Sequence, residues 1–230
     1  MIKKAILLIL FLLLGEFAWA GTQKIIFATG EWPPATSEKL SGYGFVTQIV
    51  TSACRAVNLT PEYRFYPWKR AESMVKSGKI IAAFPYMITD ERKKGYNYSD
   101  PLFYGINYFI YYDKNPNTPK QIKFDTVKDL MGYKIGMIRG TPMEAELRQK
   151  GLTVDVTTIL DQSIIKLTRG RLDFYLTEQM VFRDAIQRLF PNQTQHFKKL
   201  PRSYGPKRPN ALLVSRQFPD AESTIKRFNK

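Results

Sequence analysis

The chain has 230 residues, 44% of them hydrophobic, which is enough to bury the core of one large domain or of two smaller lobes. Its net charge of +15 favours anionic partners, such as an acidic ligand or an anionic membrane, with a basic solvated surface as the alternative; no nucleic-acid-binding motif is present. One cysteine and one histidine exclude a disulfide framework and a cysteine-based zinc site, so we expect no metal and no cofactor.

The first twenty residues have the pattern of a secretory signal. Lys3 and Lys4 precede an unbroken apolar run at 5–14, and Ala18 and Ala20 frame a small-x-small cleavage pattern. The run is too short to cross a bilayer as a helix, although an uncleaved membrane anchor is the alternative. We therefore expect cleavage after Ala20 and a protein of the periplasm.

Strands and helices alternate along the first part of the chain. Apolar runs bounded by turn residues predict strands, and apolar residues at helical spacing predict helices. The predicted order is a strand at 24–29, a helix at 43–57, a strand at 62–66, a helix at 68–76 and a strand at 80–84. This β-α-β-α-β order is typical of a mainly parallel sheet covered by helices.

A second alternating set follows. Its predicted strands are 107–112, 134–138, 153–157, 171–176, a return strand within 195–200, and 211–214. Its predicted helices are 126–131, 141–150, one beginning after 161, 178–189 and 218–228. The turn and strand GKIIAAF at 78–84 recur as GRLDFYL at 170–176, so we expect two similar lobes that face a cleft.

Polar residues follow several of these strands. Ligands bind open α/β sheets at the carboxyl ends of the strands. Those ends are 30–34, 85–91, 139–142 and 177–178. Arg92, just beyond the second of them, can clamp a carboxylate with two parallel hydrogen bonds, although a surface arginine in a charged run is the alternative.

The motifs in this order resemble the periplasmic solute-binding proteins of family 3, the extracellular amino-acid receptors of ABC transporters and related sensors. The matching segments are GEWPP, PWKRAESMVKSGKIIAAF, ITDERKKGYNYSDPLF, KIGMIRGTPMEAEL and GRLDFYL. The resemblance covers nearly all of the chain beyond the signal, and the segment with Thr89, Arg92 and Asp100 is its most specific part.

The resemblance implies an α/β fold with two lobes, each a mainly parallel sheet flanked by helices, joined by two crossing hinge strands near 108–112 and within 197–213. We expect a signal peptide at 1–20, a discontinuous first lobe at 21–109 and 205–230, and a second lobe at 110–204. The chain ends at Lys230, earlier than is usual for the family, which indicates a trimmed lobe or an incomplete chain.

The resemblance also assigns ligand contacts. Arg92 matches the arginine that pairs with the ligand carboxylate, and Thr141 matches the helix start that holds the same group, where free N–H groups attract anions. Glu178 stands near the usual aspartate for the ligand ammonium. Thr141 could instead be a plain helix cap, and Glu178 could instead interact with the dipole of its helix.

Four further residues complete the predicted site. Trp32 and Trp68 could form aromatic walls against the ligand or could pack in the core. Glu31 could bind a basic ligand group or cap a loop. Tyr86 lies where relatives carry small, serine-like residues, and this greater apolar bulk suggests a ligand other than a standard amino acid.

The sequence favours a monomeric receptor that closes on a small carboxylate or zwitterion and delivers it to a membrane permease or a sensor. One alternative is an enzyme on the same fold, similar to cyclohexadienyl dehydratases, with Glu178 as general acid. Another is a sensor receptor without a transporter. We expect binding rather than catalysis.

Overall fold

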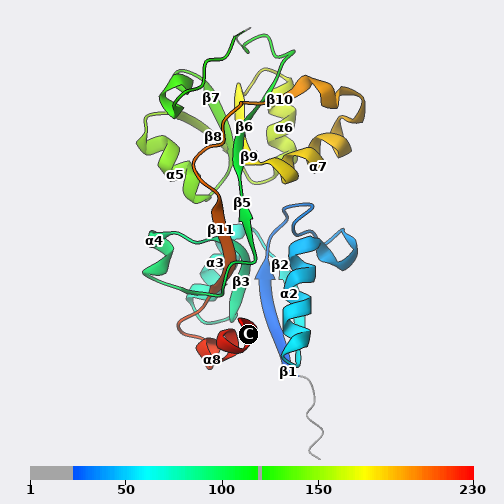
Figure 1. Cartoon of the computed structure of the whole chain (residues 1–230), viewed down its shortest axis with the longest axis vertical. Helices are drawn as coiled ribbons and strands as arrows, with labels where there is room; N and C mark the ends of the chain where they lie inside the picture. The colour runs from blue at the N-terminus through cyan, green and yellow to red at the C-terminus, as the bar shows by residue number, and fades with distance from the viewer. Residues whose placement is uncertain (1–22, 119–120) are drawn as a thin grey trace, which may run out of the picture.

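The computed structural model describes residues 23–118 and 121–230, so the predicted signal peptide and its cleavage site lie outside the described residues. Two α/β lobes lie end to end, joined at a narrow waist (Figure 1). This confirms the predicted fold class. Within the described part of the chain, no helix has the length and apolarity needed to cross a membrane.

The first lobe is built on a six-stranded sheet. Its strands are β1 (Gln23–Thr29), β2 (Leu59–Phe65), β3 (Ala82–Met87), β4 (Asn97–Tyr98), β5 (Phe103–Gly105) and β11 (Arg208–Val214). The order is β2-β1-β3-β11-β4, with β5 beside β11. Strands β1, β2 and β3 are parallel, as expected, whereas β11 is antiparallel to its neighbours because it returns from the other lobe.

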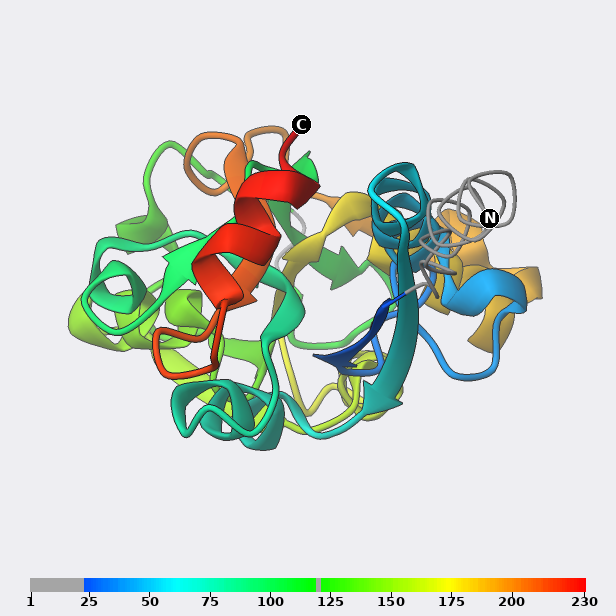
Figure 2. The same cartoon turned by 90° about the horizontal axis from the view of Figure 1, so that it is seen from below.

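Helices cover both faces of this sheet. They are α2 (Phe45–Ala56), α3 (Trp68–Lys76), the short α4 (Asp90–Lys93) and α8 (Ala221–Phe228), with a 3-10 turn η1 (Ser41–Tyr43) before α2. The view from below shows α8 lying across the free end of the lobe (Figure 2). One core contains Phe27, Val50 and Cys54 on the side of α2, and the other contains Ala71 and Val75 of α3.

The second lobe has five strands in the order β10-β6-β9-β7-β8. They are β6 (Asn107–Tyr112), β7 (Lys134–Ile138), β8 (Thr153–Thr157), β9 (Phe174–Glu178) and β10 (Phe197–Lys199). The helices are α5 (Pro142–Gln149), α6 (Leu160–Thr168) and α7 (Gln179–Leu189), with 3-10 turns η2 (Val127–Leu130) and η3 (Pro191–His196). Strands β7, β8 and β9 are parallel, and β6 and β10 are antiparallel.

In both copies of the turn-and-strand unit, the strand begins later than predicted. Strand β3 begins at Ala82 rather than residue 80, and β9 begins at Phe174 rather than residue 171. In both copies the strand begins four residues after a turn glycine with positive φ, Gly78 or Gly170. The chain needs these residues to pass from the preceding helix into the sheet, and the shared offset supports the equivalence of the two lobes.

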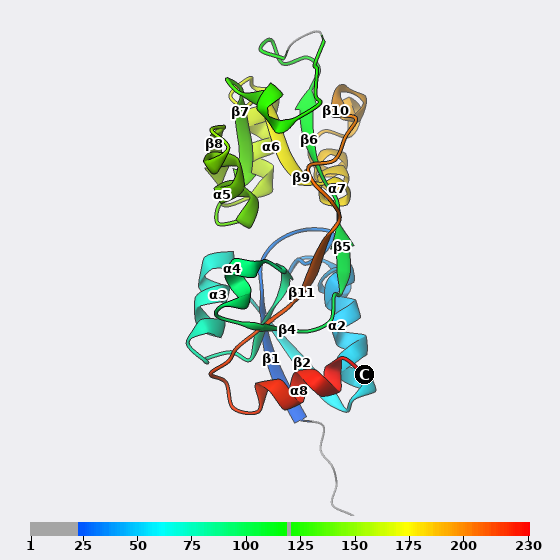
Figure 3. The ribbon, with the colours of Figure 1, turned by 60° about the vertical axis from the view of Figure 1, so that its left-hand side comes forward.

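Two crossing segments join the lobes (Figure 3). The first passes from β5 in one sheet to β6 in the other between Gly105 and Asn107, and the second passes from β10 to β11. The predicted boundary at 109/110 falls inside β6, so residues 107–109 lie in the second sheet. A hydrophobic pattern cannot mark this point, because the chain stays extended from one sheet into the next.

Side chains of the first lobe reach the core of the second. Met87, at the end of β3, packs with Met143 and Leu176 in a core of the second lobe. Trp32 packs against cores of both lobes. A Cβ on Gly140 would lie 2.6 Å from the Lys69 side chain, so α3 and the α5 loop also touch. The lobes therefore touch through side chains as well as through the two crossing segments.

Candidate functional site

A cleft with a cavity volume of about 120 Å³ lies between the lobes. It is lined by the carboxyl ends of β3, β7 and β9, as expected for open α/β sheets. Its lining is mostly apolar and includes Trp32, Trp68, Tyr86, Met87, Met137 and Met143, and its polar members include Arg92, Thr141 and Glu178. Six of the seven residues predicted for the site thus line one cleft.

Arg92 is fixed in the wall of this cleft by three elements of the first lobe. Thr89 is the N-cap residue of α4, and its hydroxyl accepts a hydrogen bond from the Arg92 backbone N–H. The guanidinium donates from Nε and Nη2 to the two carboxylate oxygens of Glu72 on α3, both at 3.3 Å. Its carbon also lies 4.8 Å from the centre of the Tyr86 ring.

The Glu72 contact occupies only one edge of the guanidinium. Nε and Nη2 face Glu72, whereas Nη1 donates a 3.4 Å bond to the Met87 carbonyl. A guanidinium has five N–H groups, so one N–H on Nη1 and one on Nη2 remain for a second carboxylate. Because the side chain is only 11% exposed, a carboxylate bound there would be largely shielded from water.

Tyr86 supplies a ring, and not a hydroxyl, to the cleft. Its O–H donates a 2.7 Å hydrogen bond to the Trp68 carbonyl, which turns the polar end toward α3. Burial raises the pKa of Tyr86 far above its usual range, and the charge of Glu72 adds to this effect. The phenol is therefore neutral at any physiological pH and presents an apolar ring beside Arg92.

The two predicted aromatic walls are both present. The Trp68 ring lies against the backbone of Gly30, where an added Cβ would come within 2.6 Å of Cε2. Trp32 lies in a bend that is closed by a β-bridge between its backbone and that of Thr36. The centre of its ring lies 6.2 Å from the centre of the Phe103 ring. Each tryptophan packs against a core and also lines the cleft, so both alternatives fit the geometry, and stacking on a ligand stays a prediction.

On the second lobe, the loop before α5 supplies the facing wall. Thr141 is the N-cap residue, but its hydroxyl donates to the Ile138 carbonyl instead of capping the helix. Glu144 in the first turn accepts a 2.8 Å bond from the Gly140 N–H. Pro142, at the first helical position, has no N–H, and the Gly140 N–H is already bonded to Glu144. This helix start therefore offers fewer backbone N–H donors to a ligand than one without these features.

Glu178 and Glu31 differ in their placement. Glu178 lines the cleft, but its Oε2 accepts hydrogen bonds from the Met180 and Val181 N–H groups and so caps α7. Glu31 does not line the cleft: its exposed carboxylate accepts a 2.7 Å bond from the Glu38 N–H and stabilises a loop. The predicted ligand role of Glu31 therefore has no support in this geometry.

Sequence reasoning missed several polar residues of the cleft. Asn107, Arg139, Thr177 and Asn210 all line it. Arg139 and Thr177 lie at the predicted strand ends 139–142 and 177–178, but no motif singled them out as ligand contacts. Asn107 and Asn210 lie on the crossing strands, and no local pattern marks such residues. Among residues 23–118 and 121–230, no three His, Cys, Asp or Glu side chains are grouped to hold a metal.

Comparisons with solved structures reproduce the two-lobed fold. An ancestral arginine-binding protein bound to arginine superposes with a TM-score of 0.74 at 20% identity, covering 91% of this chain and 90% of that one. A histidine kinase sensor domain with similarity to periplasmic binding proteins superposes with a TM-score of 0.76 at 17% identity, covering 90% of this chain and 88% of that one. At these identities the likeness concerns the fold alone.

Sequence comparisons point to the same group. The chain is 27% identical to the L-cystine-binding protein TcyJ of Escherichia coli K12 over 164 residues, 69% of this chain. A probable amino-acid-binding protein, YxeM of Bacillus subtilis, is 22% identical over 167 residues. The matched segments span about 60% of the length of these relatives. The model of the bacterial extracellular solute-binding proteins, family 3, matches residues 25–200. The chain belongs to this family of bacterial extracellular solute-binding proteins.

Proposed function

We propose that this protein binds a small carboxylate-bearing molecule, amino-acid-like in size and charge, between its two lobes. The observation that carries the proposal is the position of Arg92, which lines the cleft, is nearly buried and has one guanidinium edge not taken by Glu72. A carboxylate on that edge would make charge-assisted, two-point hydrogen bonds. The relatives named for cystine and arginine binding support a ligand of this kind.

Binding would favour closure of the lobes, because the ligand would contact Arg92 on one lobe and the Thr141 loop on the other. We propose that the exported, monomeric protein then presents its ligand to a membrane permease or a sensor. The likeness to a transport-type binding protein and to a kinase sensor domain fits both routes. Catalysis by Glu178 is less favoured, since its Oε2 already caps α7.

The test is a thermal-shift screen of the chain from Gly21, followed by calorimetry. The panel is the twenty L-amino acids, L-cystine, dicarboxylates, polyamines and prephenate. A ligand at 100 times its Kd stabilises the folded state by about 2.7 kcal/mol. We expect such a thermal shift with a carboxylate ligand. In Arg92→Lys, calorimetry should give an affinity for that ligand at least about tenfold lower, because lysine keeps the charge but cannot make two parallel hydrogen bonds to a carboxylate.

The matched control is Arg64→Lys, because Arg64 on β2 pairs with Glu62 at the exposed surface, away from the cleft lining. Equal losses in the two variants, or a shift only with polyamines, would contradict the carboxylate site. Turnover of prephenate would move the assignment to an enzyme.

A further inference from the structure

We propose that Arg216 is a positioning residue of the carboxylate site: it closes the end of the short helix α4 and thereby holds Arg92 in the wall of the cleft. This inference rests on the proposed function and extends it to a residue that does not line the cleft. Arg216 lies two residues beyond the end of β11, at the exposed surface of the first lobe.

The guanidinium of Arg216 is directed at the C-terminal end of α4. It donates hydrogen bonds of 2.7 to 3.3 Å to the carbonyls of Lys93, Lys94 and Tyr96 and to Oδ1 of Asn97. Lys93 is the last residue of α4, and Lys94 is its C-cap. The last carbonyls of a helix lack partners within the helix, and a cation placed there also interacts favourably with the helix dipole. One side chain therefore satisfies this helix end.

Helix α4 depends on such contacts because it is a single turn. It contains four residues, Asp90–Lys93, and so short a helix is not stable by itself in water. At its start, the Thr89 hydroxyl caps the backbone. At its end, Gly95 follows the C-cap but does not have the left-handed φ with which a glycine usually ends a helix. Arg216 supplies the closure at this end.

Tyr96 connects Arg216 to both members of the ion pair in the cleft wall. Its carbonyl accepts from Arg216, and its backbone N–H donates to the Arg92 carbonyl at 3.0 Å. Its hydroxyl donates to the Glu72 carbonyl at 3.5 Å, and Glu72 is the partner of the Arg92 guanidinium. Tyr96 is only 8% exposed, so it has little room to adjust. A shift of this segment would therefore move Arg92 relative to Glu72.

The sheet gives Arg216 a fixed base. The preceding residue, Ser215, is buried, and its N–H donates to the Ile81 carbonyl at 2.8 Å. Its hydroxyl oxygen accepts from the N–H groups of Gln217 and Phe218, both at 3.1 Å. The strand before it, β11, lies between β3 and β4 and comes directly from the second lobe. The helix that carries Arg92 is thus tied to one of the strands that join the lobes.

The test follows the Nε–H signal of Arg92 in ¹⁵N NMR spectra of the chain from Gly21, with Arg92→Lys used to assign it. The matched control is Arg227→Gln, because Arg227 donates from Nη2 to the Val57 carbonyl at 2.6 Å elsewhere on the same lobe. We expect Arg216→Gln to shift or broaden the Arg92 signal, and Arg216→Lys to do so less, since lysine keeps a cationic donor. Arg227→Gln should leave the signal in place, as should any change that acts on stability alone.

Carboxylate binding is then measured by titration with sodium acetate, against sodium chloride at the same ionic strength, with the Arg92 signal as the readout. The affinity for acetate is expected to be at least about fivefold lower in Arg216→Gln than in the wild type, and intermediate in Arg216→Lys. A wild-type Arg92 signal and acetate affinity in Arg216→Gln would overturn the proposal, as would equal changes in Arg227→Gln. If acetate leaves the wild-type signal unmoved while that signal still depends on Arg216, the carboxylate site fails and the positioning role stands.

Discussion

Glu72 and Arg92 form a two-point ion pair in the wall of the cleft, with both N–O distances at 3.3 Å and side chains only 18% and 11% exposed. The pair joins α3 to α4 across twenty residues of sequence. It holds the guanidinium in place before a ligand arrives. It also means that removal of either partner leaves a nearly buried charge without its counter-charge.

The pair therefore predicts strongly coupled stabilities. We expect Glu72→Ala to lower the free energy of unfolding by about 3–5 kcal/mol, because Arg92 would remain desolvated and unpaired. The double variant Glu72→Ala, Arg92→Met should recover most of this loss, since no buried charge remains. Urea denaturation of the single and double variants measures the coupling. Additive losses would show that the pair is screened and contributes little.

Gly30 is expected to tolerate no side chain, because the Trp68 ring occupies the space of a Cβ. Gly30→Ala should push the ring aside and cost about 1–3 kcal/mol of stability. The change should also alter tryptophan fluorescence and weaken ligand binding at this wall. Gly95→Ala is the matched control, since nothing lies within 4 Å of its Cβ position. Similar effects in both variants would contradict the steric explanation.

The contact of Glu146 with Arg208 gives the protein a pH-dependent link between α5 and the start of β11. Arg208 donates from Nη1 and Nη2 to the two carboxylate oxygens at 2.6 and 2.8 Å. Burial raises the pKa of Glu146, but the hydrogen bonds and charge of Arg208 outweigh it, so the pKa lies below its ordinary value.

A lowered carboxyl pKa contributes stability above the ordinary pKa, and this stability is lost as pH falls through the lowered value. We expect Glu146→Gln to be less stable than the wild type by about 1–2 kcal/mol at pH 7. The difference should vanish in acid, once the wild-type carboxyl is protonated. Tm measured from pH 7 down to pH 3 in both proteins checks this. A difference that stays constant with pH would refute the link.

Cys54 reports on unfolding of the first lobe. The residue is fully buried in α2, and burial raises the pKa of its thiol to about 12. Because only the thiolate reacts, and only when exposed, labelling with a disulfide reagent at pH 8 should require opening of the lobe. We expect a rate at least about a thousandfold below that in urea, consistent with ordinary domain stability. Rapid labelling of the folded protein would mean that α2 opens locally.

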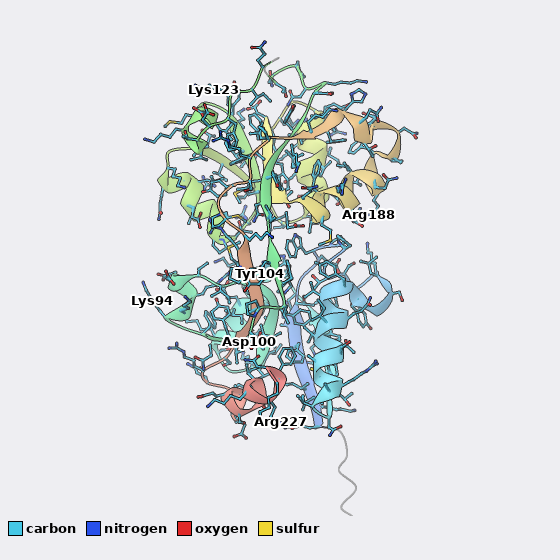
Figure 4. All side chains as sticks on the ribbon, viewed as in Figure 1. Lys94, Asp100, Tyr104, Lys123, Arg188 and Arg227 are labelled. Atoms are coloured by element: carbon cyan, nitrogen blue, oxygen red, sulfur yellow. The ribbon has the colours of Figure 1, made fainter. Side chains whose placement is uncertain are left out.

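The high positive charge is carried largely by solvated side chains. Lys94 and Lys123 point outward from the two lobes (Figure 4), and their side chains are 74% and 82% exposed. Both lysines form exposed ion pairs, with Glu91 and Asp125, and Arg188 pairs in the same way with Asp161. These observations agree with the basic solvated surface considered from composition, and such exposed pairs contribute little to stability.

Sequence by itself determined the alternation of strands and helices and the strand ends at which the cleft forms. The helix at Trp68–Lys76 and the strands at Asn107–Tyr112, Lys134–Ile138 and Thr153–Thr157 have the predicted bounds. Their apolar periodicity and glycine turns are local signals, each readable within about ten residues. These signals placed Thr141 and Glu178 at strand ends of the second lobe and Arg92 just beyond a strand end of the first, whereas the resemblance to the family assigned all three to one ligand.

Only the tertiary structure decided what those side chains contact. The pairing of Arg92 with Glu72, the capping of α7 by Glu178 and the loop contact of Glu31 all depend on which groups meet in space. Hydrogen bonds and desolvation act over a few ångströms, between residues that sequence spacing leaves far apart. The fold class is therefore encoded in local pattern, whereas the chemistry of the cleft is set by contacts that exist only once both lobes are folded.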